Sequence, residues 1–556
     1  MQKKKSMVSL YSLMTSFLIP FPSAALRSQD FMAKMLLFIC LFSLQLTILH
    51  GLDSPSDYGH SLPDLVQGKI LHCSSLSSDD KLLCQIEAAL DAQGYLEAPG
   101  KNATQHSKTP PATMSCKFRE DNVYSLYPYA MDPSPLLESV LERYFAMHIR
   151  CKDIEFANLS DVYASSSRRP NCRYLIWRPS GDGLGNRLLS LVSSFLYAIM
   201  SARVLLIDYP PWHDLFCEPF LGSTIQLPAP NKLNYWVGHW YTEFRDARCG
   251  AHITSSNAAV CNDTTVNLSL DHDTPIREYE SVACPMGFAR LRNVPFVYIR
   301  ECNQYMIPGF YINPLLSPLL DVLFPQRNAF HLLARFLLFP NDAVWNSIKS
   351  NLDFDASRRI GVQIREFKKG KYTSAYDANI VRCIKKKGGF FPRRYRKRIQ
   401  RAEYFSIYVA TLVKHHVEEM NKAMRVVEEQ SGKKLTVKWQ VVDGKEMHDS
   451  QHQKEALIDM WVLSMSHVLI TSAESTFGYV ATGLSGVVPF FLDKEDGGSC
   501  TMGNGLEPCF HAAPRNLLCI QEEPLAYSLL DMALNSSKVK NCIDRPRLGW
   551  TAVSPM

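Results

Sequence analysis

The stretch Arg173–Asp208 decides the fold class, and it reads RYLIWRPSGDGLGNRLLSLVSSFLYAIMSARVLLID. It opens with an apolar run at Arg173–Trp177, passes through a glycine-rich loop, and continues into a strongly apolar segment, Asn186–Met200. A second apolar run, Arg203–Asp208, closes the stretch. Two continuously apolar strands that flank a helix are typical of a parallel sheet covered on both faces. The stretch therefore predicts an α/β fold.

The same alternation of apolar strands and helices recurs further along the chain. An amphipathic helix, Leu136–Arg150, precedes the stretch, and a second sheet is expected after about Ser357. The expected strands are Arg359–Phe367, Lys434–Asp443, Val468–Ser472 and Val487–Leu492, and the expected helices are Arg401–Glu429, Gln453–Ser466 and Thr476–Leu484. We predict two doubly wound, Rossmann-like domains, at 114–335 and 336–556.

Composition fits a globular protein of two or three domains. The chain has 556 residues, of which 46% are apolar and 21% charged. None of its 16 cysteines lies in a C-x-x-C pair, so we predict no metal site. Scattered cysteines favour an oxidising compartment, and buried thiols in a cytosolic protein are the alternative.

The N-terminal segment favours a membrane anchor. Lys3, Lys4 and Lys5 precede an uncharged stretch, and a denser apolar run follows at Met35–Leu49. We predict a cytosolic tail and anchor within 1–52, with the anchor at 35–49, a stem at 53–113, and a lumenal body. A cleaved signal peptide is the alternative.

Glycosylation sequons support a lumenal body. N-x-[ST] occurs at five positions: Asn102, Asn158, Asn262, Asn267 and Asn535. With Cys40 in the anchor, 15 cysteines are lumenal. Because 15 is odd, at least one thiol stays reduced or pairs with another chain, which leaves a homodimer open.

The glycine-rich loop, Gly181–Arg187, lies between a strand and the start of a helix, where backbone amides attract anions. Asp208, at the end of the next strand, is where a ribose-binding acid of an NAD(P) site would lie. Asn186 stands where a dinucleotide fingerprint has Gly or Ala, so the loop favours a tight strand-to-helix turn over an NAD(P) site.

Two further loops follow strands of the second half. We expect Arg365 to alternate with Ile364 on a buried strand, where its guanidinium needs an anion such as a diphosphate, or an acidic side chain. In Thr471–Gly478, the hydroxyls of Ser472, Ser475 and Thr476 either cap the next helix or bind phosphate. Two polar strand-end loops in one half favour a nucleotide site.

Two surface features remain. Arg382–Arg401 contains ten Lys and Arg and no acid, and without it the net charge of +6 would become −4. It is a solvated basic face or a site for an anionic partner, and nucleic acid does not fit the compartment. Tyr235–Tyr241 is dense in aromatics, which either stack on sugar rings or form core.

Four blocks of the chain resemble a known family. In chain order they are PSPLLESVLERYFAMHIRC, YLIW…GLGNRLLSLVSSFLYA…RVLLID…DLFCEPF, VLITSAESTFGYVATGLSGVVPFFL and LEPCFHAAP. They closely resemble the plant galactoside 2-alpha-L-fucosyltransferases (xyloglucan fucosyltransferase type, glycosyltransferase family 37), from about Asp79 to about Trp550. The resemblance implies a GT-B-like fold and a single-pass type II Golgi enzyme.

The reaction that the resemblance implies is transfer of L-fucose from GDP-fucose to the 2-OH of a terminal galactose. The acceptor would be a cell-wall polysaccharide or arabinogalactan glycan, the anomeric centre would invert, and no metal or other cofactor would be required. The first domain would then face the acceptor, and the second would bind GDP-fucose.

The resemblance also implies roles for single residues. Arg365 would grip the diphosphate. The remaining nucleotide contacts would come from Gly185, Asn186, Arg187, Ser472, Ser475, Thr476 and Phe477. His452 stands where the family has a histidine before the helix that leads to the second loop. We predict acceptor contacts from His452 and, because of the aromatic run, from Trp236, His239 and Trp240. Candidates for the catalytic base are Glu366, Asp208 and Asp443.

Two acids depart from the family pattern. Glu366 stands where the family has an aliphatic residue, and Glu474 where it has Trp. Because acids beside a diphosphate would repel it, a glycan-binding homologue with little turnover is an alternative function. An NAD(P) oxidoreductase is a more remote alternative, resting on the glycine-rich loop alone.

Overall fold

A computed structural model of the chain describes residues 116–121, 123–151, 172–227, 242–243, 265–270, 276–291, 294–366, 374–391, 403–440, 449–492, 500–522 and 525–554. The predicted anchor, stem and aromatic run, and the sequons at Asn102, Asn158 and Asn262, lie outside these residues. Within the described ranges, no helix combines the length and apolar character needed to cross a membrane.

The first half is built on a parallel sheet whose strands run in the order β2-β1-β5-β4-β3. The strands are β1 (Tyr174–Pro179), β2 (Val204–Ile207), β3 (Thr242–Glu243), β4 (Thr265–Ser269) and β5 (Phe296–Cys302). Its helices are α5 (Lys117–Glu120), α6 (Pro135–Arg150), α8 (Leu184–Met200), α9 (Trp212–Leu215), α11 (Glu280–Ala283), α12 (Pro285–Arg290), α13 (Ile307–Ile312), α14 (Ser317–Leu323), α15 (Ala329–Leu337) and α16 (Asp342–Asn351).

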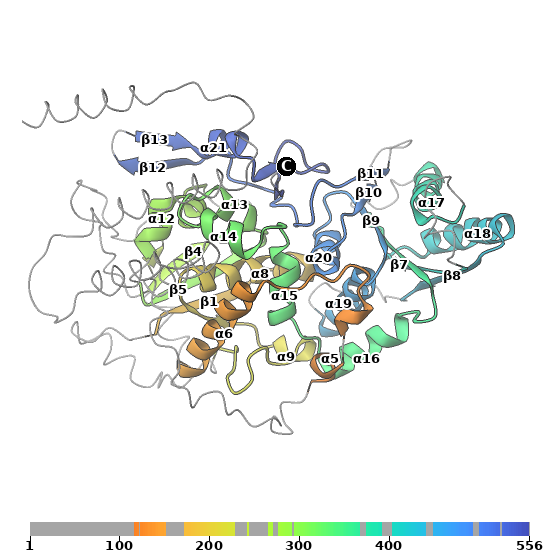
Figure 1. The fold of residues 1–556 in the computed structure, drawn as a ribbon, viewed down its shortest axis with the longest axis horizontal. Coiled ribbons are helices and arrows are strands. Elements are labelled where there is room, and N and C mark those ends of the chain that lie inside the picture. Colours follow the sequence, from red (N-terminus) through yellow and green to blue (C-terminus); the bar gives the residue numbers. More distant parts are fainter. Residues whose placement is uncertain are drawn as a thin grey trace, which may run out of the picture. The chain divides into compact units, whose positions relative to one another are not determined.

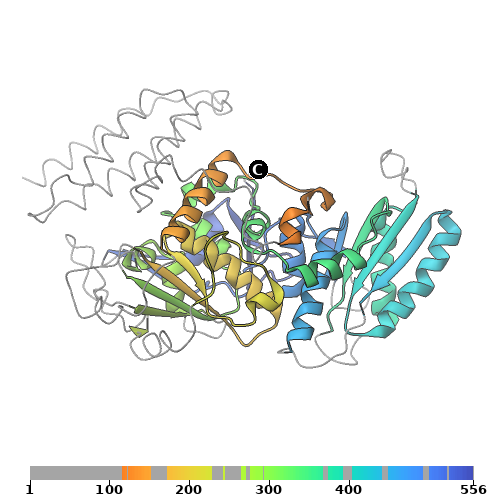
Figure 2. The same cartoon turned by 90° about the horizontal axis from the view of Figure 1, so that it is seen from below.

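The second half holds a six-stranded sheet in the order β11-β10-β9-β6-β7-β8, in which β11 alone is antiparallel to its neighbour. Its strands are β6 (Arg358–Gln363), β7 (Tyr404–Ala410), β8 (Lys434–Trp439), β9 (Val468–Ser472), β10 (Phe490–Leu492) and β11 (Cys500–Met502). Its helices are α17 (Ser374–Gly388), α18 (Lys414–Ser431), α19 (Ser450–Ser464) and α20 (Thr476–Ser485). The α/β prediction with two parallel sheets is confirmed, and α18 lies along the second sheet (Figure 2).

The prediction of a single helix over Arg401–Glu429 was wrong. Tyr404–Ala410 (YFSIYVA) forms β7, and α18 begins only at Lys414. Aromatic and β-branched residues favour a buried strand, whereas the Lys- and Glu-rich stretch after it favours a helix. The strand and the helix each have an apolar face. Read as one segment, their apolar residues look like the pattern of a single long amphipathic helix.

Helix α8 is buried along almost its whole length, because 16 of its 17 residues are buried and Asn186 alone is partly exposed. It contacts β1 and β5 on one side and α15 and α20 on the other, and Figure 1 shows it beside α20. The hydroxyls of Ser193 and Ser194 donate to the carbonyls of Leu189 and Ser190, four residues earlier. These bonds allow polar side chains in a helix that is buried all round.

The end of the chain returns to the first half. The hairpin β12 (Leu518–Glu522) and β13 (Leu525–Ser528), helix α21 (Leu529–Asn535), and the pair β14 (Val539–Asn541) and β15 (Trp550–Ala552) follow β11. β12 contacts α12, and α13 contacts α21 (Figure 1). The disulfide Cys284–Cys519 joins the two segments covalently. The predicted span 336–556 thus includes a segment that packs against the first half.

Two of the predicted sequons lie in described residues. Asn267 is in β4, between β3 and β5, and its side chain is 0% exposed. The prediction of a glycan at Asn267 is therefore wrong for the folded chain, since a buried strand leaves no room for a sugar. Asn535 is exposed at the end of α21, and its glycosylation stays a prediction.

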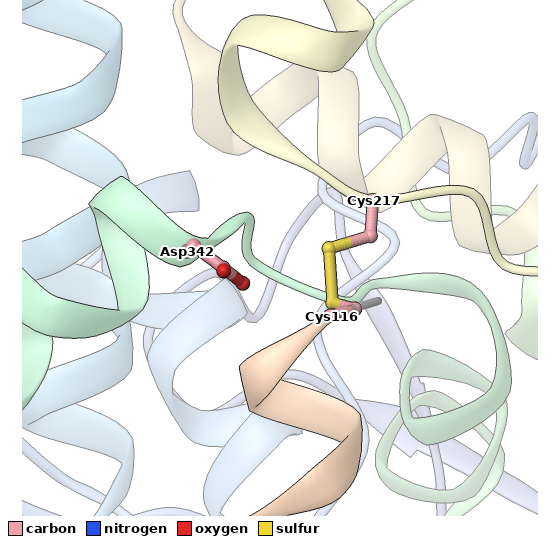
Figure 3. A group of neighbouring side chains, drawn as sticks. All are labelled: Cys116, Cys217 and Asp342. Atoms are coloured by element: carbon pink, nitrogen blue, oxygen red, sulfur yellow. A yellow bond between two sulfur atoms is a disulfide. The ribbon is translucent and has the colours of Figure 1, made fainter. Parts of the chain in front are cut away.

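Ten cysteines of the described residues form five disulfides, which are Cys116–Cys217, Cys151–Cys172, Cys284–Cys519, Cys383–Cys500 and Cys509–Cys542. Cys302 is buried and keeps its thiol. Figure 3 shows the disulfide Cys116–Cys217 beside Asp342, whose Oδ1 accepts from the Lys117 amide at 2.9 Å. This acid and the two sulfurs lie close enough to hold a metal, as do Asp544 and the Cys509–Cys542 pair. Because disulfide sulfurs are not thiolates, both groups serve as covalent staples.

Glu507 links the returning segment to α15. Its carboxylate accepts from the Ala329 amide and from the Tyr305 hydroxyl, and burial raises the pKa of the Glu507 carboxyl from 4.5 to about 7. A carboxyl whose pKa is raised by folding binds more protons when folded than when unfolded. Its contribution to stability is complete below about pH 4 and is lost as the pH rises through about 7.

We therefore expect Glu507→Gln to gain stability relative to the wild type as the pH rises from 5 to 8. Thermal melts of the two proteins at both pH values measure this difference. The exposed Glu138→Gln controls for loss of a negative charge. The assignment fails if the difference in melting temperature between Glu507→Gln and wild type is the same at pH 5 and pH 8.

Candidate active site

Two loops of the second half meet at the carboxyl edge of its sheet. Strands β6 and β9 are parallel neighbours, with Gln363 opposite Thr471. The residues that follow, Ile364–Glu366 and Ala473–Ser475, therefore leave the sheet side by side. Ligands of open α/β sheets bind outside this edge.

The loop after β6 is held by a serine of β9. The Arg365 amide donates to Ser472 Oγ at 2.9 Å, and the Ser472 amide donates to Gln363 Oε1 at 3.1 Å. From α17, the Tyr376 hydroxyl lies 3.4 Å from Ser472 Oγ. Ser472 is 3% exposed, so it acts here on the backbone of the Arg365 loop.

The expectation that Arg365 lies on a buried strand was wrong. The strand ends at Gln363, and Ile364 continues the apolar alternation with 3% exposure. Arg365 lies one residue further, and its side chain is exposed. The guanidinium is therefore positioned at the sheet edge by a fixed backbone, where it can reach a soluble anion.

The loop after β9 leads into the N-terminus of α20. Ser475 is its N-cap, and Ser475 Oγ accepts from the Gly478 amide at 3.5 Å. Capping is thus one role of Ser475, and Thr476 and Phe477 form the partly exposed first turn. The amides of a helix start and its dipole favour an anion at this place.

Glu474 does not project an unpaired charge at this helix start. Its backbone has φ +59°, and its amide donates to Asp544 Oδ2 at 2.8 Å. Its carboxylate forms an ion pair with Arg545, with Nη1 and Oε2 3.4 Å apart. Burial raises the pKa of the Asp544 carboxyl, which also accepts from the Tyr479 hydroxyl at 2.6 Å.

The glycine-rich loop of the first half reaches the same place through Gly185. A Cβ atom at Gly185 would lie 2.9 Å from the Phe477 amide nitrogen and 2.9 Å from the Thr476 carbonyl carbon. Only glycine lets the two backbones approach so closely. The predicted loops of the two halves, Gly181–Arg187 and Thr471–Gly478, are thus brought together.

Arg187, Tyr209 and Gln453 connect the halves a second time. Arg187 is 5% exposed, and its Nε donates to the Ser180 carbonyl at 3.1 Å. Its Nη1 donates to the Tyr209 hydroxyl at 3.3 Å, and that hydroxyl donates to Gln453 Oε1. Asp208 and His452 are the sequence neighbours of Tyr209 and Gln453, on either side of this contact between the halves.

Asp208 is at the carboxyl end of β2. Its Oδ2 accepts from the Tyr298 hydroxyl at 2.7 Å and lies 3.9 Å from Arg178 Nε, and the side chain is 22% exposed. Burial, followed by the bond to Asp208, raises the pKa of the Tyr298 hydroxyl, so this phenol stays a donor.

Two polar atoms of the predicted site residues have no hydrogen-bond partner in the described structure. Across the described part of the chain, no group hydrogen-bonds to His452 Nδ1 or to Asn186 Oδ1, although both atoms are buried.

Several predictions are only partly covered by the described residues. Trp236, His239, Trp240 and Asp443 lie outside them, as does the second half of the basic run, 392–401. The first half of that run forms the end of α17, where Lys385, Lys386 and Lys387 meet the negative end of the helix dipole. Phe390 belongs to the hydrophobic core, and the centroids of its ring and the Phe405 ring are 4.9 Å apart.

The comparisons with known proteins identify the family. The sequence profile described as xyloglucan fucosyltransferase matches residues 110–518. The chain belongs to the xyloglucan fucosyltransferase family. Its relatives in this family include a galactoside 2-alpha-L-fucosyltransferase of Pisum sativum, 30% identical over 512 residues, covering 87% of this chain and 86% of the relative. Putative fucosyltransferase 10 of Arabidopsis thaliana is 30% identical over 418 residues, 70% of this chain and 80% of the relative.

A solved structure from the same family has the same fold. It is that of a variant of Arabidopsis thaliana FUT1 in complex with GDP. The match has a TM-score of 0.65 and 26% identity, and it covers 83% of this chain and 99% of FUT1. Family membership confirms the resemblance and the GT-B-like fold, and it removes the oxidoreductase alternative. Gly185 meets the backbone of α20 instead of completing a dinucleotide turn.

Sequence reasoning missed the residues that support the site in this family member. Tyr376, Asp377 and His416 lie on helices that carry no recognisable motif, and Asp544 and Arg545 come from the far end of the chain. Tyr209 directly follows the predicted Asp208, which was the one local signal for it. The others depend on tertiary packing.

We expect Gly185→Ala to lower stability by about 1–3 kcal/mol, because the added methyl meets backbone atoms that cannot rotate away. Thermal melts and fucosyl transfer rates measure the effect. Gly181→Ala is the matched control in the same loop, since its Cβ meets nothing within 4 Å. Equal melting temperatures for the two variants would contradict the close contact between α8 and α20.

Proposed function

We propose that this fucosyltransferase transfers L-fucose from GDP-fucose to the 2-OH of a terminal galactose, with inversion. The observation that carries the proposal is the fixed Arg365 loop beside the α20 N-terminus, in a chain whose family includes galactoside 2-alpha-L-fucosyltransferases. The FUT1 variant, a neighbour of known structure, is in complex with GDP. A cell-wall polysaccharide or arabinogalactan glycan is the proposed acceptor.

Arg365 and the first amides of α20 are proposed to bind the diphosphate. Departure of GDP places negative charge on its terminal phosphate, and a guanidinium with helix-end amides stabilises that charge. We propose on this basis a reaction that requires no metal. Thr476 and Phe477 bring the amides, and Gly185, Asn186 and Arg187 close the site from the first half.

The structure weakens the argument for a glycan-binding homologue with little turnover. It was based on repulsion of the donor by Glu366 and Glu474, and both carboxylates have partners, His416 and Arg545. Each acid is therefore held by a partner within the protein.

Inversion requires that the acceptor hydroxyl attack opposite the departing GDP and lose its proton. Of the described candidate bases, Glu366 is bound by His416 within the second half. Asp208 lies at the junction of the halves, partly exposed, with Tyr298 fixing one carboxylate oxygen. We propose Asp208 as the base and His452 as an acceptor contact.

The proposed location is the Golgi membrane, in a single-pass type II topology with the folded body in the lumen. Five disulfides in the described residues and the exposed sequon at Asn535 support an oxidising, glycosylating compartment. The proposed anchor remains Met35–Leu49.

Arg365→Ala is expected to lower kcat/KM for GDP-fucose by about 100-fold or more, and Arg365→Lys by less, because Lys keeps the charge without the planar fork. The assay uses the full chain in detergent with a galactose-terminated xyloglucan oligosaccharide and detects the mass of one added deoxyhexose. Arg425→Ala, an exposed arginine on α18, is the control. Wild-type protein that yields no fucosylated product would refute the proposed reaction.

Asp208→Asn is expected to lower kcat by about 100-fold or more with little change in KM for GDP-fucose, because the amide still accepts from Tyr298 but takes no proton. Glu366→Gln, the other described candidate, should keep its kcat. Full activity of Asp208→Asn would show instead that the proton leaves late, without this base.

A further inference from the structure

Glu366, beside Arg365, is bound by a buried histidine. His416, in the first turn of α18, is 3% exposed. Its Nε2 lies 3.0 Å from Glu366 Oε1, and its Nδ1 lies 2.5 Å from Asp377 Oδ1. Glu366 lies in the loop that follows β6, and Asp377 lies in the first turn of α17. The His416 ring, on α18, therefore connects this loop to α17.

The bridge requires two protons. Each ring nitrogen of His416 faces a carboxylate oxygen, and a hydrogen bond between them needs a proton in each gap. The ring of His416 thus contacts both acids at once and ties Glu366 to Asp377. The exposed His415 approaches the other oxygen of Asp377, with Nε2 and Oδ2 3.4 Å apart.

The same residues connect back to Arg365 from the other side. The Tyr376 ring packs edge-on against His416, with ring centroids 6.0 Å apart, and its hydroxyl lies 3.4 Å from Ser472 Oγ. Ser472 Oγ accepts from the Arg365 amide. Contacts therefore run in a closed ring from Arg365 through Ser472, Tyr376 and His416 to Glu366.

We propose that His416 and Asp377 are positioning residues that keep the Glu366 carboxylate away from the Arg365 guanidinium. Without His416, a carboxylate one residue from Arg365 would be free to pair with it and would compete with the diphosphate. This inference rests on the proposed function, because it assumes that Arg365 binds the donor. The acid that departs from the family pattern is thus held by a histidine, which a second acid holds in turn.

His416→Ala is expected to raise KM for GDP-fucose about tenfold while kcat changes less than about threefold, because the released carboxylate weakens donor binding. Adding Glu366→Gln to His416→Ala removes the competing charge. The double variant should return to within about threefold of Glu366→Gln alone. A histidine that only supports the fold would not be rescued by a change at Glu366.

His415→Ala is the matched control, since His415 neighbours His416 and touches Asp377 but is exposed. Its KM should stay within about twofold of wild type. If His416→Ala does not fold, Asp377→Asn with and without Glu366→Gln makes the same comparison, with a smaller rise in KM. An unchanged KM in folded His416→Ala, or a double variant no better than the single, would overturn the proposal.

The failure of the proposed function looks different. In that case the wild-type chain would neither bind GDP-fucose in calorimetry nor form product. If wild type and variants bind GDP-fucose equally well, the fucosyl transfer proposal stands and only the positioning role of His416 is lost.

Discussion

The approach of two helix backbones at Gly185 is the constraint on which the rest of the structure depends. A Cβ atom placed on Gly185, in the first turn of α8, would lie only 2.9 Å from backbone atoms of Thr476 and Phe477. The two halves therefore meet backbone to backbone. Because the second half covers α8 here, the helix is buried on every side, and Ser193 and Ser194 bond to carbonyls of their own helix. It also brings the two loops with the greatest capacity for anions to one place.

The two unexpected acids of the site are held by partners elsewhere in the chain. Glu366 and Glu474 each adjoin a loop expected to hold phosphate, and each has a basic partner from a distant part of the chain. The partner of Glu474 is on the C-terminal segment, whose Asp544 also fixes the Glu474 amide. The last residues of the chain therefore support a nucleotide loop as well as the first half of the fold, to which Cys519 binds them.

Periodicity predicted both parallel sheets because their strands are continuously apolar, as in Val468–Ser472, which forms β9 with those bounds. Periodicity missed the strand at Tyr404–Ala410, because this short strand lies only a few residues before a long helix and the two look like one element. The strand-end loops were predictable because topology places them at one edge. The partners of the two acids were not, since a histidine on α18 and an arginine near the C-terminus carry no local signal of what they contact. The exposure of Arg365 depended on where β6 ends, which alternation alone does not fix.

The central claim is that the loops at Gly185–Arg187, Ile364–Glu366 and Ser472–Phe477 form one donor site. Hydrogen exchange of the full chain with and without GDP, read by mass spectrometry, tests it most directly. The account predicts slower exchange on GDP addition in peptides from all three loops, and unchanged exchange in the hairpin β12–β13. Protection confined to the glycine-rich loop, or to segments away from all three, would contradict it.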